Sequence, residues 1–403
     1  MELFWLEHKK LWRKKIVKIC VLLCFVYYVI FGSILSFQWF SFGSSDDYTS
    51  AFGNNFDGYT VIKDSQEYAL SFGGELTDET LQQIVSDYQQ MEADGMEEEL
   101  EKTDWQIVNS WLGTLYPELR DTSNYKTMIS YVDPDKLTGF YERRQQVLDE
   151  FLEVSGQVGA EKEYLHQIER KVEKPFRYEW VEGWSTLLGS MVADLGVVMA
   201  LFLGIVLSSL FAGEWHDNTS TLVLTTRNGW GKIALAKILT GLAFTVELFA
   251  LLAVSIVISQ LFFMGTAGWD MPIQNIKLIA VAPMNMLQAE IYEYAFVLLG
   301  AIGFAGIVMF ISAAVKNNVL TLLLSLAVVY GPMMIAEYLP YEMQKALDLI
   351  PLVGSSTDIF RTNTFRIFGK LIWSPYLLIT IPVLIGILCM PFAIKSWSRR
   401  MKA

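Results

Sequence analysis

The chain has 403 residues, of which 53% are hydrophobic, and its formal net charge is −12. Soluble globular chains carry roughly 45–50% apolar residues, so this composition excludes an ordinary soluble protein and favours a membrane protein. So acidic a chain also gives no reason to expect nucleic acid as a partner.

Motifs for catalysis and for metal or nucleotide binding are missing from the sequence. The three cysteines, Cys20, Cys24 and Cys389, lie in apolar runs, where small packing residues are expected. The three histidines are far apart, and GWGKI at 229–233 lacks the spacing of a phosphate-binding loop. We therefore expect no enzyme activity, no metal and no cofactor bound by this chain.

The sequence begins with a basic amphipathic segment over residues 1–15. Phe4, Trp5 and Trp12 are interspersed there with lysine and arginine. Aromatic and basic residues together are typical of a helix that lies on the inner membrane surface, in contact with lipid headgroups. We predict such an inner-surface helix.

Six apolar runs follow the amphipathic segment, each close to or above the length of about 20 residues that crosses a membrane. They cover residues 16–40, 187–210, 233–263, 292–315, 319–336 and 376–394. A shorter apolar stretch, Leu278–Met286, is expected at the membrane interface. The predicted fold class is an all-α polytopic membrane protein with about six spans.

Residues 41–183 form a polar block between the first two runs, long enough for one small domain. Within it, residues 44–182 hold 30 acidic and 12 basic side chains. Thr77 is expected to cap an acidic helix, and Phe140–Val172 to form a second long helix. We predict a largely helical extracellular domain, whose acidic face is either a solvated surface or a dock for a cationic peptide.

Lysine and arginine indicate the orientation, because both are enriched on the cytoplasmic side of membrane proteins. The N-terminal segment, the strip 211–232, the turn 315–318 and the tail 395–403 all carry them. With six spans these segments fall on one side. We therefore expect a multi-pass protein of the cell membrane with both termini in the cytoplasm.

Two carboxylates lie well inside the apolar runs, Asp194 in the second and Glu247 in the third. A carboxylate at membrane depth is unfavourable unless it faces protein or water. Both are therefore candidates for a translocation path, with a structural hydrogen bond between helices as the alternative. In the fourth run, Ala301 and Ala305 have a spacing that suits close helix packing.

Two connecting segments have an unusual composition. The strip 211–232 begins as a polar gap between two long runs, which indicates contact with a partner outside the membrane. Residues 337–375, before the last run, are apolar for a loop. They are expected either to form short helices in the outer leaflet or to be a plain interfacial linker.

These features together resemble the type-2 ABC exporter permeases (the ABC-2 type), over the whole chain except the polar block. The motif F-x-x-E-x-x-x-x-T-x-x-L-x-x-T is met by Phe211, Glu214, Thr219, Leu222 and Thr225. Asn218 stands where glycine is common, and Arg227 and Trp230 replace the usual proline and arginine of the next turn. The resemblance implies that the strip is a coupling helix docked on an ATP-binding subunit, with Glu214 as a prominent contact.

The same resemblance implies the partners. ATP and Mg would be held by an ATP-binding subunit present in two copies, and a second copy of this permease or a homologous permease would complete the transporter. A large outer domain after the first span resembles exporters of peptides from Gram-positive bacteria, of the phenol-soluble-modulin and lantibiotic types. An amphipathic peptide is therefore the expected substrate.

Other functions fit parts of the pattern. One is export of a drug or a lipid-linked substrate, and another is a membrane receptor or sensor with an extracellular ligand-binding domain. A mechanotransmitting permease would have four spans, which disagrees with the number of apolar runs. An intramembrane enzyme that uses Glu247 and Asp194 as a pair would lack a nucleophile and metal ligands.

Overall fold

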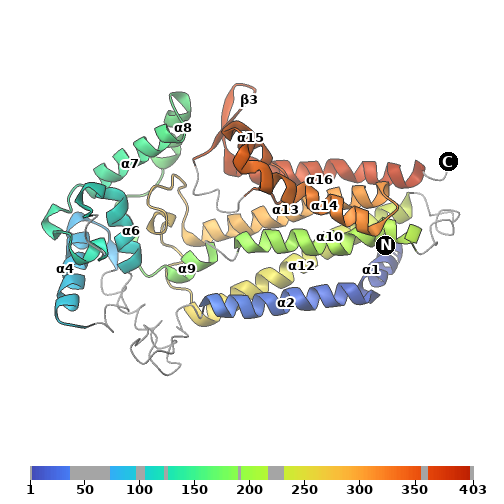
Figure 1. Cartoon of the computed structure of the whole chain (residues 1–403), viewed down its shortest axis with the longest axis horizontal. Helices are drawn as coiled ribbons and strands as arrows, with labels where there is room; N and C mark the ends of the chain where they lie inside the picture. Colours follow the sequence, from blue (N-terminus) through green and yellow to red (C-terminus); the bar gives the residue numbers. More distant parts are fainter. Residues whose placement is uncertain are drawn as a thin grey trace.

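The computed structural model describes residues 2–36, 73–96, 105–121, 126–188, 192–216, 231–354 and 362–399. These residues are mostly helical, with two small two-stranded sheets. Figure 1 shows an elongated molecule in which long helices run side by side and a smaller globular part covers one end of them. We call that end the domain end, and the opposite end, where both chain termini lie, the terminal end.

Five of the described helices are long and apolar enough to cross a membrane. They are α10 (Val192–His216), α12 (Lys232–Met264), α13 (Met286–Ala314), α14 (Asn318–Ile335) and α16 (Ser374–Arg399). The expectation of a mostly helical, multi-pass membrane protein is confirmed to this extent. The first expected run corresponds to α2 (Lys15–Ser36), a helix of 22 residues that packs along α12 (Figure 1).

The helix α13 makes its most extensive contacts with α16 and α10. Gly303 and Gly306 of α13 face Pro382 and Gly386 of α16, and a Cβ added at Gly306 would overlap the carbonyl oxygen of Gly386. Small residues allow helix backbones to approach closely in a membrane. The close approach of α13 to α16 is made at these glycines, and Ala301 and Ala305 are also fully buried.

The helix α10 extends further than the sequence indicates. It continues through Phe211 and Glu214 to His216, so the first part of the expected coupling strip is the end of a long helix. Residues 217–230 of the strip lie outside the described residues. Only the stretch that directly precedes α12 is described again, from Gly231 onward.

The helix α13 begins at Met286, well before the expected start at residue 292. Asn285 and Gln288 cause the early start, because they form a capping box at the first turn. The Asn285 side chain accepts from the backbone N–H of Gln288, and the Gln288 side chain accepts from the backbone N–H of Asn285. The earlier start brings Glu290 into the helix, one turn before Glu293.

The N-terminal segment forms α1 (Glu2–Arg13), within the range expected for the inner-surface helix. A bend at Lys14 separates it from α2. α1 packs against α12, with Leu11 buried and with Trp5 and Leu6 exposed. It therefore lies on the bundle with one face and offers an aromatic and aliphatic face outward.

The globular part at the domain end, here called the polar domain, covers residues 73–184. Its helices are α4 (Asp78–Ala93), α6 (Trp105–Leu115), η2 (Pro117–Leu119), η3 (Met128–Ser130), η4 (Pro134–Lys136), α7 (Phe140–Val154), α8 (Ala160–Glu169) and α9 (Glu182–Thr186). β1 (Gly74–Glu75) pairs antiparallel with β2 (Arg177–Tyr178). The predicted helix cap is confirmed, because the Thr77 hydroxyl accepts from the Thr80 N–H at 3.2 Å.

The expectation of one long helix over Phe140–Val172 is wrong. The chain turns at Gly156 and Gly159, which have φ values of 74° and 59°, and this turn separates α7 from α8. Val154 and Val158, two apolar residues of this range, are exposed and do not pack in the core. The residues that α7 buries are Phe140, Arg144, Leu148 and Leu152.

The loop between α12 and α13 completes the polar domain. It contains η6 (Ile273–Asn275), and the carbonyl oxygen of Asn275 accepts from the Trp111 indole N–H at 3.2 Å. Leu278 is buried in the apolar core of the polar domain. The apolar residues of Leu278–Met286, the stretch expected at the membrane interface, are mostly buried within protein cores.

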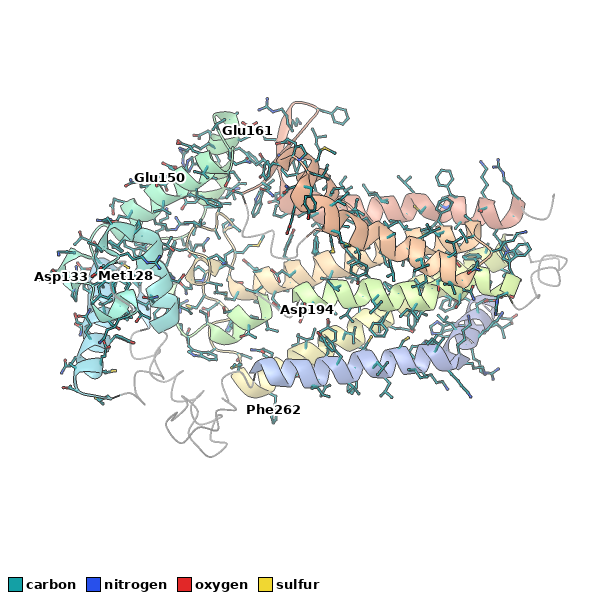
Figure 2. The ribbon with its side chains drawn as sticks, viewed as in Figure 1. Met128, Asp133, Glu150, Glu161, Asp194 and Phe262 are labelled. Atoms are coloured by element: carbon teal, nitrogen blue, oxygen red, sulfur yellow. The ribbon has the colours of Figure 1, made fainter. Side chains whose placement is uncertain are left out.

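The segment before α16 forms η7 (Ala336–Tyr338), α15 (Tyr341–Leu347) and an antiparallel hairpin of β3 (Thr364–Ile367) and β4 (Lys370–Trp373). Short helices were expected here, and the hairpin was not. The hairpin contacts the polar domain at two points: Thr364 donates to the side chain of Gln157, in the turn between α7 and α8, at 2.7 Å, and Arg366 pairs with Glu161 of α8 at 2.5 Å. Figure 2 shows Glu161 next to the hairpin.

Candidate functional site

A buried charge network joins α1, α10 and α12 at the terminal end. One carboxylate oxygen of Glu214, near the end of α10, accepts from Lys10 of α1 at 2.6 Å and from Lys237 of α12 at 2.8 Å. Lys237 also donates to Glu7 of α1 at 2.8 Å. Two lysines and two glutamates thus hold together three helices that are far apart in the sequence.

Burial makes the centre of this network depend on complete pairing. Glu214 is 4% exposed and Lys237 is 1% exposed. Removing one partner of a buried ion pair costs about 3–5 kcal/mol, because the other charge stays buried without compensation. The Lys10 side chain is half exposed, so its ion pair contributes less. The resemblance implied an outward contact by Glu214, whereas its carboxylate here faces other helices of the same chain.

Glu247 also contacts α1. Its carboxylate accepts from the Trp12 indole N–H at 3.0 Å and lies 3.2 Å from Nε2 of His8. The Trp12 ring packs edge-on against Phe244, with 5.7 Å between ring centroids. The structure thus gives Glu247 hydrogen-bond partners on a neighbouring helix, while its side chain remains partly exposed.

Phe211 is fully buried, with its ring 5.5 Å from that of Trp397 in α16. The Ser312 hydroxyl of α13 accepts from the backbone N–H groups of Phe211 and Ala212, both at 3.1 Å. The same hydroxyl donates to the carbonyl oxygen of Ser208 at 2.7 Å. A side chain thus enters the hydrogen-bond ladder of α10, and this end of α10 is fixed to α13 and α16.

The structure describes only some of the other predicted site residues. Asn218, Thr219, Leu222 and Thr225 lie outside the described residues. Within α1, the Phe4 ring stacks on His8, and Trp5 is exposed. Asp194 lies in the first turn of α10, where the helix dipole favours a carboxylate, in the half of the bundle nearer the domain end (Figure 2). No hydrogen bond or ion pair joins Asp194 to Glu247 in the described part of the chain.

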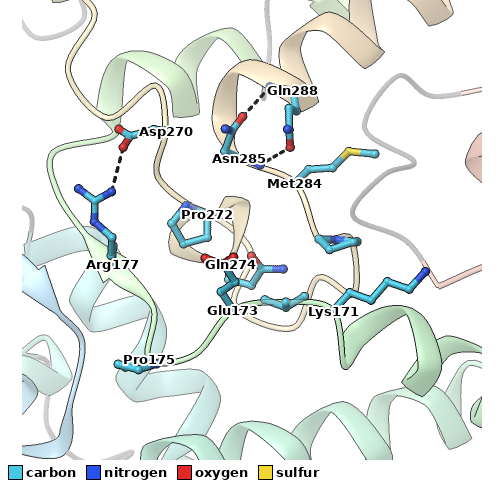
Figure 3. A pocket seen from close by; sticks show the side chains of 12 residues that line it. Lys171, Glu173, Pro175, Arg177, Asp270, Pro272, Gln274, Met284, Asn285 and Gln288 are labelled. Atoms are coloured by element: carbon cyan, nitrogen blue, oxygen red, sulfur yellow. Dashed lines mark hydrogen bonds and ion pairs between the residues drawn. The ribbon is translucent and has the colours of Figure 1, made fainter.

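A cavity of about 320 Å³ opens at the domain end, between the polar domain and the start of α13. Figure 3 shows the Arg177–Asp270 ion pair, 2.9 Å long, on one side and the capping pair Asn285 and Gln288 on another. Lys171 and Glu173 also line the cavity. Because both signs of charge are present, the lining favours a polar ligand without selecting a net charge.

Arg144 fastens the polar domain to the loop between α12 and α13. Its fully buried guanidinium donates to the carbonyl oxygens of Leu278 at 2.7 Å and Ala280 at 3.2 Å, and to Glu169 at 2.6 Å. Lys174 also contacts Glu169, at 2.8 Å. Burial alone would raise the pKa of Glu169, but its hydrogen bonds from Lys174 and Arg144 hold that pKa below the ordinary value.

Two further buried carboxylates lie in the first turns of α13, and the sequence analysis did not single them out. Glu290 is 4% exposed and Glu293 is fully buried. Their signal was a pair of glutamates at the start of an apolar run, because Glu290 lies just before the expected span 292–315 and Glu293 is the second residue of that span. Among the described residues, no group of three or more His, Cys, Asp or Glu side chains is arranged to hold a metal.

Comparison with known proteins adds no relative. No protein family, no curated protein and no solved structure matches the chain. Function is therefore inferred from the sequence pattern and from the geometry of these contacts.

Proposed function

We propose that the chain is the membrane permease subunit of an ATP-driven ABC exporter that moves an amphipathic peptide out of the cell. In this proposal α2 is the sixth span, both termini are cytoplasmic, and the polar domain is extracellular in a Gram-positive bacterium. ATP and Mg bind to two copies of a separate ATP-binding subunit. A second copy of this chain, or a homologous permease, completes the transporter.

The observation that carries the proposal is the ion pair between Glu214 and Lys237. The middle of the strip, residues 217–231, is covalently continuous with α10 at one end and with α12 at the other. Glu214 and Lys237 tie these two helices together close to the strip, and Lys10 adds α1 to the same cluster. A partner that displaces the strip therefore moves three helices together, which is what coupling to an ATPase requires.

Purification of the tagged full chain from its own membranes tests the partner. We expect an ATP-binding subunit to co-purify in near-stoichiometric amount. Leu222→Glu, within the strip, is expected to abolish this association, because a charge is introduced into the docking segment. Lys9→Gln, an exposed site on α1 with the same change in net charge, is the matched control. Absence of any ATPase from both wild type and control contradicts the proposal.

The substrate requires a separate test. The excess of acidic residues in segment 44–182 supports a cationic amphipathic peptide, because opposite charge raises the local concentration of a substrate. Proteoliposomes containing the complete transporter should accumulate such a peptide when ATP is supplied, and charge-neutralised versions of the peptide should be poorer substrates. Equal transport of an uncharged drug would favour a drug exporter, and transport of a lipid-linked substrate would favour that class.

A ligand sensor is the second candidate, and the cavity at the domain end favours it. The cavity is shared by the polar domain and the start of α13, so a ligand there contacts both. A sensor would purify without an ATPase and would show a ligand-dependent rise in unfolding temperature. Loss of that rise in Asp270→Asn, which removes the charge partner of Arg177, would assign it to this cavity.

A further inference from the structure

Glu290 and Glu293 lie one turn apart on the same face of α13, in the part of the bundle nearest the polar domain. All four of their side-chain oxygens are covered by protein, and none makes a hydrogen bond of good geometry, although the Tyr294 hydroxyl lies within hydrogen-bonding reach of Glu290. A buried carboxylate without a donor loses its hydration and gains nothing in return. Two ionised carboxylates so close together also repel each other.

Among the described residues, the groups found to interact with the pair, directly or through one another, are two tyrosine hydroxyls. Tyr294 lies one turn beyond Glu290, and Tyr28 of α2 is fully buried nearby, within electrostatic reach of Tyr294. Both tyrosine hydroxyls are covered, and neither makes a hydrogen bond of good geometry. The pair of carboxylates thus belongs to a buried polar cluster, drawn from two helices, whose hydrogen-bonding capacity is largely unused.

Charged side chains on the helices around α13 do not neutralise the pair. α10 contributes Asp194, which is itself acidic, and α12 contributes Glu247, which is bound to α1. α14 carries no charged residue. The basic residues of α12 and α16 lie at the terminal end: Lys232, Lys237, Lys395 and Arg399.

Burial also decides which cation fits. The oxygens are covered so closely that no water-sized space touches them, which excludes a sodium ion or an ammonium group together with its ligands. A proton needs no cavity. It bonds to a carboxylate oxygen, removes the charge and turns the group into a carboxylic acid that both donates and accepts hydrogen bonds.

We propose that Glu290 and Glu293 form a proton-binding site that is filled in the arrangement described here. Each carboxyl keeps its proton while the domain end of α13 is covered. When that end opens to water, the O–H bond breaks, the proton passes to a water molecule, and a hydrated carboxylate remains. The site does not rest on the exporter proposal, because any function that opens and closes the domain end would exchange protons here.

Infrared spectroscopy of the full chain in lipid nanodiscs tests this site directly, because the C=O stretch of a protonated carboxylic acid is separate from the carboxylate bands. At neutral pH we expect this band in the wild type. Glu290→Gln and Glu293→Gln should each lower its intensity, and the double variant should remove it. Glu337→Gln, an exposed glutamate at the same end of the bundle, should leave the band unchanged.

A measurement without variants covers the case in which glutamine prevents folding. Labelling all glutamates of the wild type with ¹³C shifts their C=O band away from that of aspartate, so a protonated glutamate is identified in the native chain. A wild type whose glutamates are all ionised at neutral pH overturns the proposal. A band of protonated glutamate that survives in a folded, ¹³C-labelled double variant overturns it as well.

Discussion

A single carboxylate oxygen of Glu214 receives both Lys10 and Lys237, and the burial of this contact makes it sensitive to small changes. Glu214→Gln keeps the size of the side chain and removes its charge, which leaves Lys237 with Glu7 alone. We expect a loss of about 3–5 kcal/mol in unfolding free energy, as for other buried ion pairs that lose one partner. Denaturation of the full chain in lipid nanodiscs measures it.

Lys10→Gln is the matched control for that variant. Its side chain is half exposed, so the expected loss is at most about 1 kcal/mol. Equal losses in the two variants would show that Glu214 is not the centre of the network. If the folded Glu214→Gln chain still binds the ATPase but hydrolysis no longer drives transport, the coupling role of the ion pair is supported as well.

The carboxylate of Glu169 predicts a pH dependence of the polar domain. Its pKa is lowered in the folded state from the ordinary value of 4.5. The ionised Glu169 therefore stabilises the folded polar domain at pH values above its ordinary pKa. This stabilisation is lost as the pH falls through the lowered pKa of the folded state. We expect backbone amides of the loop around Leu278 to lose protection from hydrogen exchange in acid, after correction for the intrinsic exchange rate.

Glu169→Gln should weaken this loop already at neutral pH and remove the acid-dependent part of the change. Glu153→Gln is the control, because Glu153 is an exposed glutamate whose ion pair with Lys162 lies on the surface of the domain. An acid profile that is the same in wild type and Glu169→Gln would assign the pH dependence to another group.

Residue roles could be predicted where the signal is local. The cap at Thr77 was correct, because a cap involves a side chain and a backbone N–H three residues later. The partners of Glu214 and Glu247 could not be predicted, since Lys10 and Trp12 are more than 200 positions away in the sequence. An apolar run also says nothing about which of its carboxylates will be buried.

At the scale of elements, the crossing of α13 and α16 depends on glycine. A Cβ at Gly306 would overlap the backbone of Gly386, which cannot rotate away as a side chain can. We expect Gly306→Ala to destabilise the folded chain by about 1–3 kcal/mol, as other overpacking substitutions do. Gly196→Ala in α10 is the control, because a Cβ there meets no atom within 4 Å.

The control should be neutral or slightly stabilising, since alanine favours a helix by up to about 1 kcal/mol over glycine. Unfolding of both variants in nanodiscs under the same conditions provides the comparison. If Gly306→Ala matches Gly196→Ala, the two helices have room to separate, and the tight crossing is not needed for stability.

The long helices were predictable as elements, because length and apolar composition are enough to indicate a span. Their ends were not. α13 starts early because of the capping box at Asn285, and α10 continues into a polar sequence because Phe211 packs against Trp397. The break between α7 and α8 was missed because the glycine turn was read as part of one helical pattern.

At the scale of the whole molecule, the polar domain shares its core with a loop that lies between two later helices. We therefore expect residues 73–184, expressed alone, to fail to form a cooperative fold, because Trp111 and Arg144 lose their carbonyl partners. Joining residues 265–286 to this fragment through a flexible linker should restore cooperative unfolding. Near-ultraviolet circular dichroism during thermal unfolding distinguishes the two.

A control linker carrying the same residues in scrambled order should not restore the fold. If residues 73–184 unfold cooperatively on their own, they form a complete domain, and the loop 265–286 is not needed for its core. The shared core could not be predicted from sequence, because a contact between Trp111 and Asn275 spans 164 positions and leaves no periodic pattern in either segment.

The late position of that loop in the chain also fixes an order of events during biosynthesis. The ribosome synthesises residues 73–184 of the polar domain before it makes α10 and α12. The residues around Leu278, which close the core of the domain, are synthesised after both helices. Until the loop after α12 has been made, Trp111 and Arg144 lack their hydrogen-bond acceptors, the carbonyl oxygens of Asn275 and Leu278. During this time the incomplete domain is vulnerable to proteases and to aggregation. The core of the domain is therefore closed only after both intervening helices have been made.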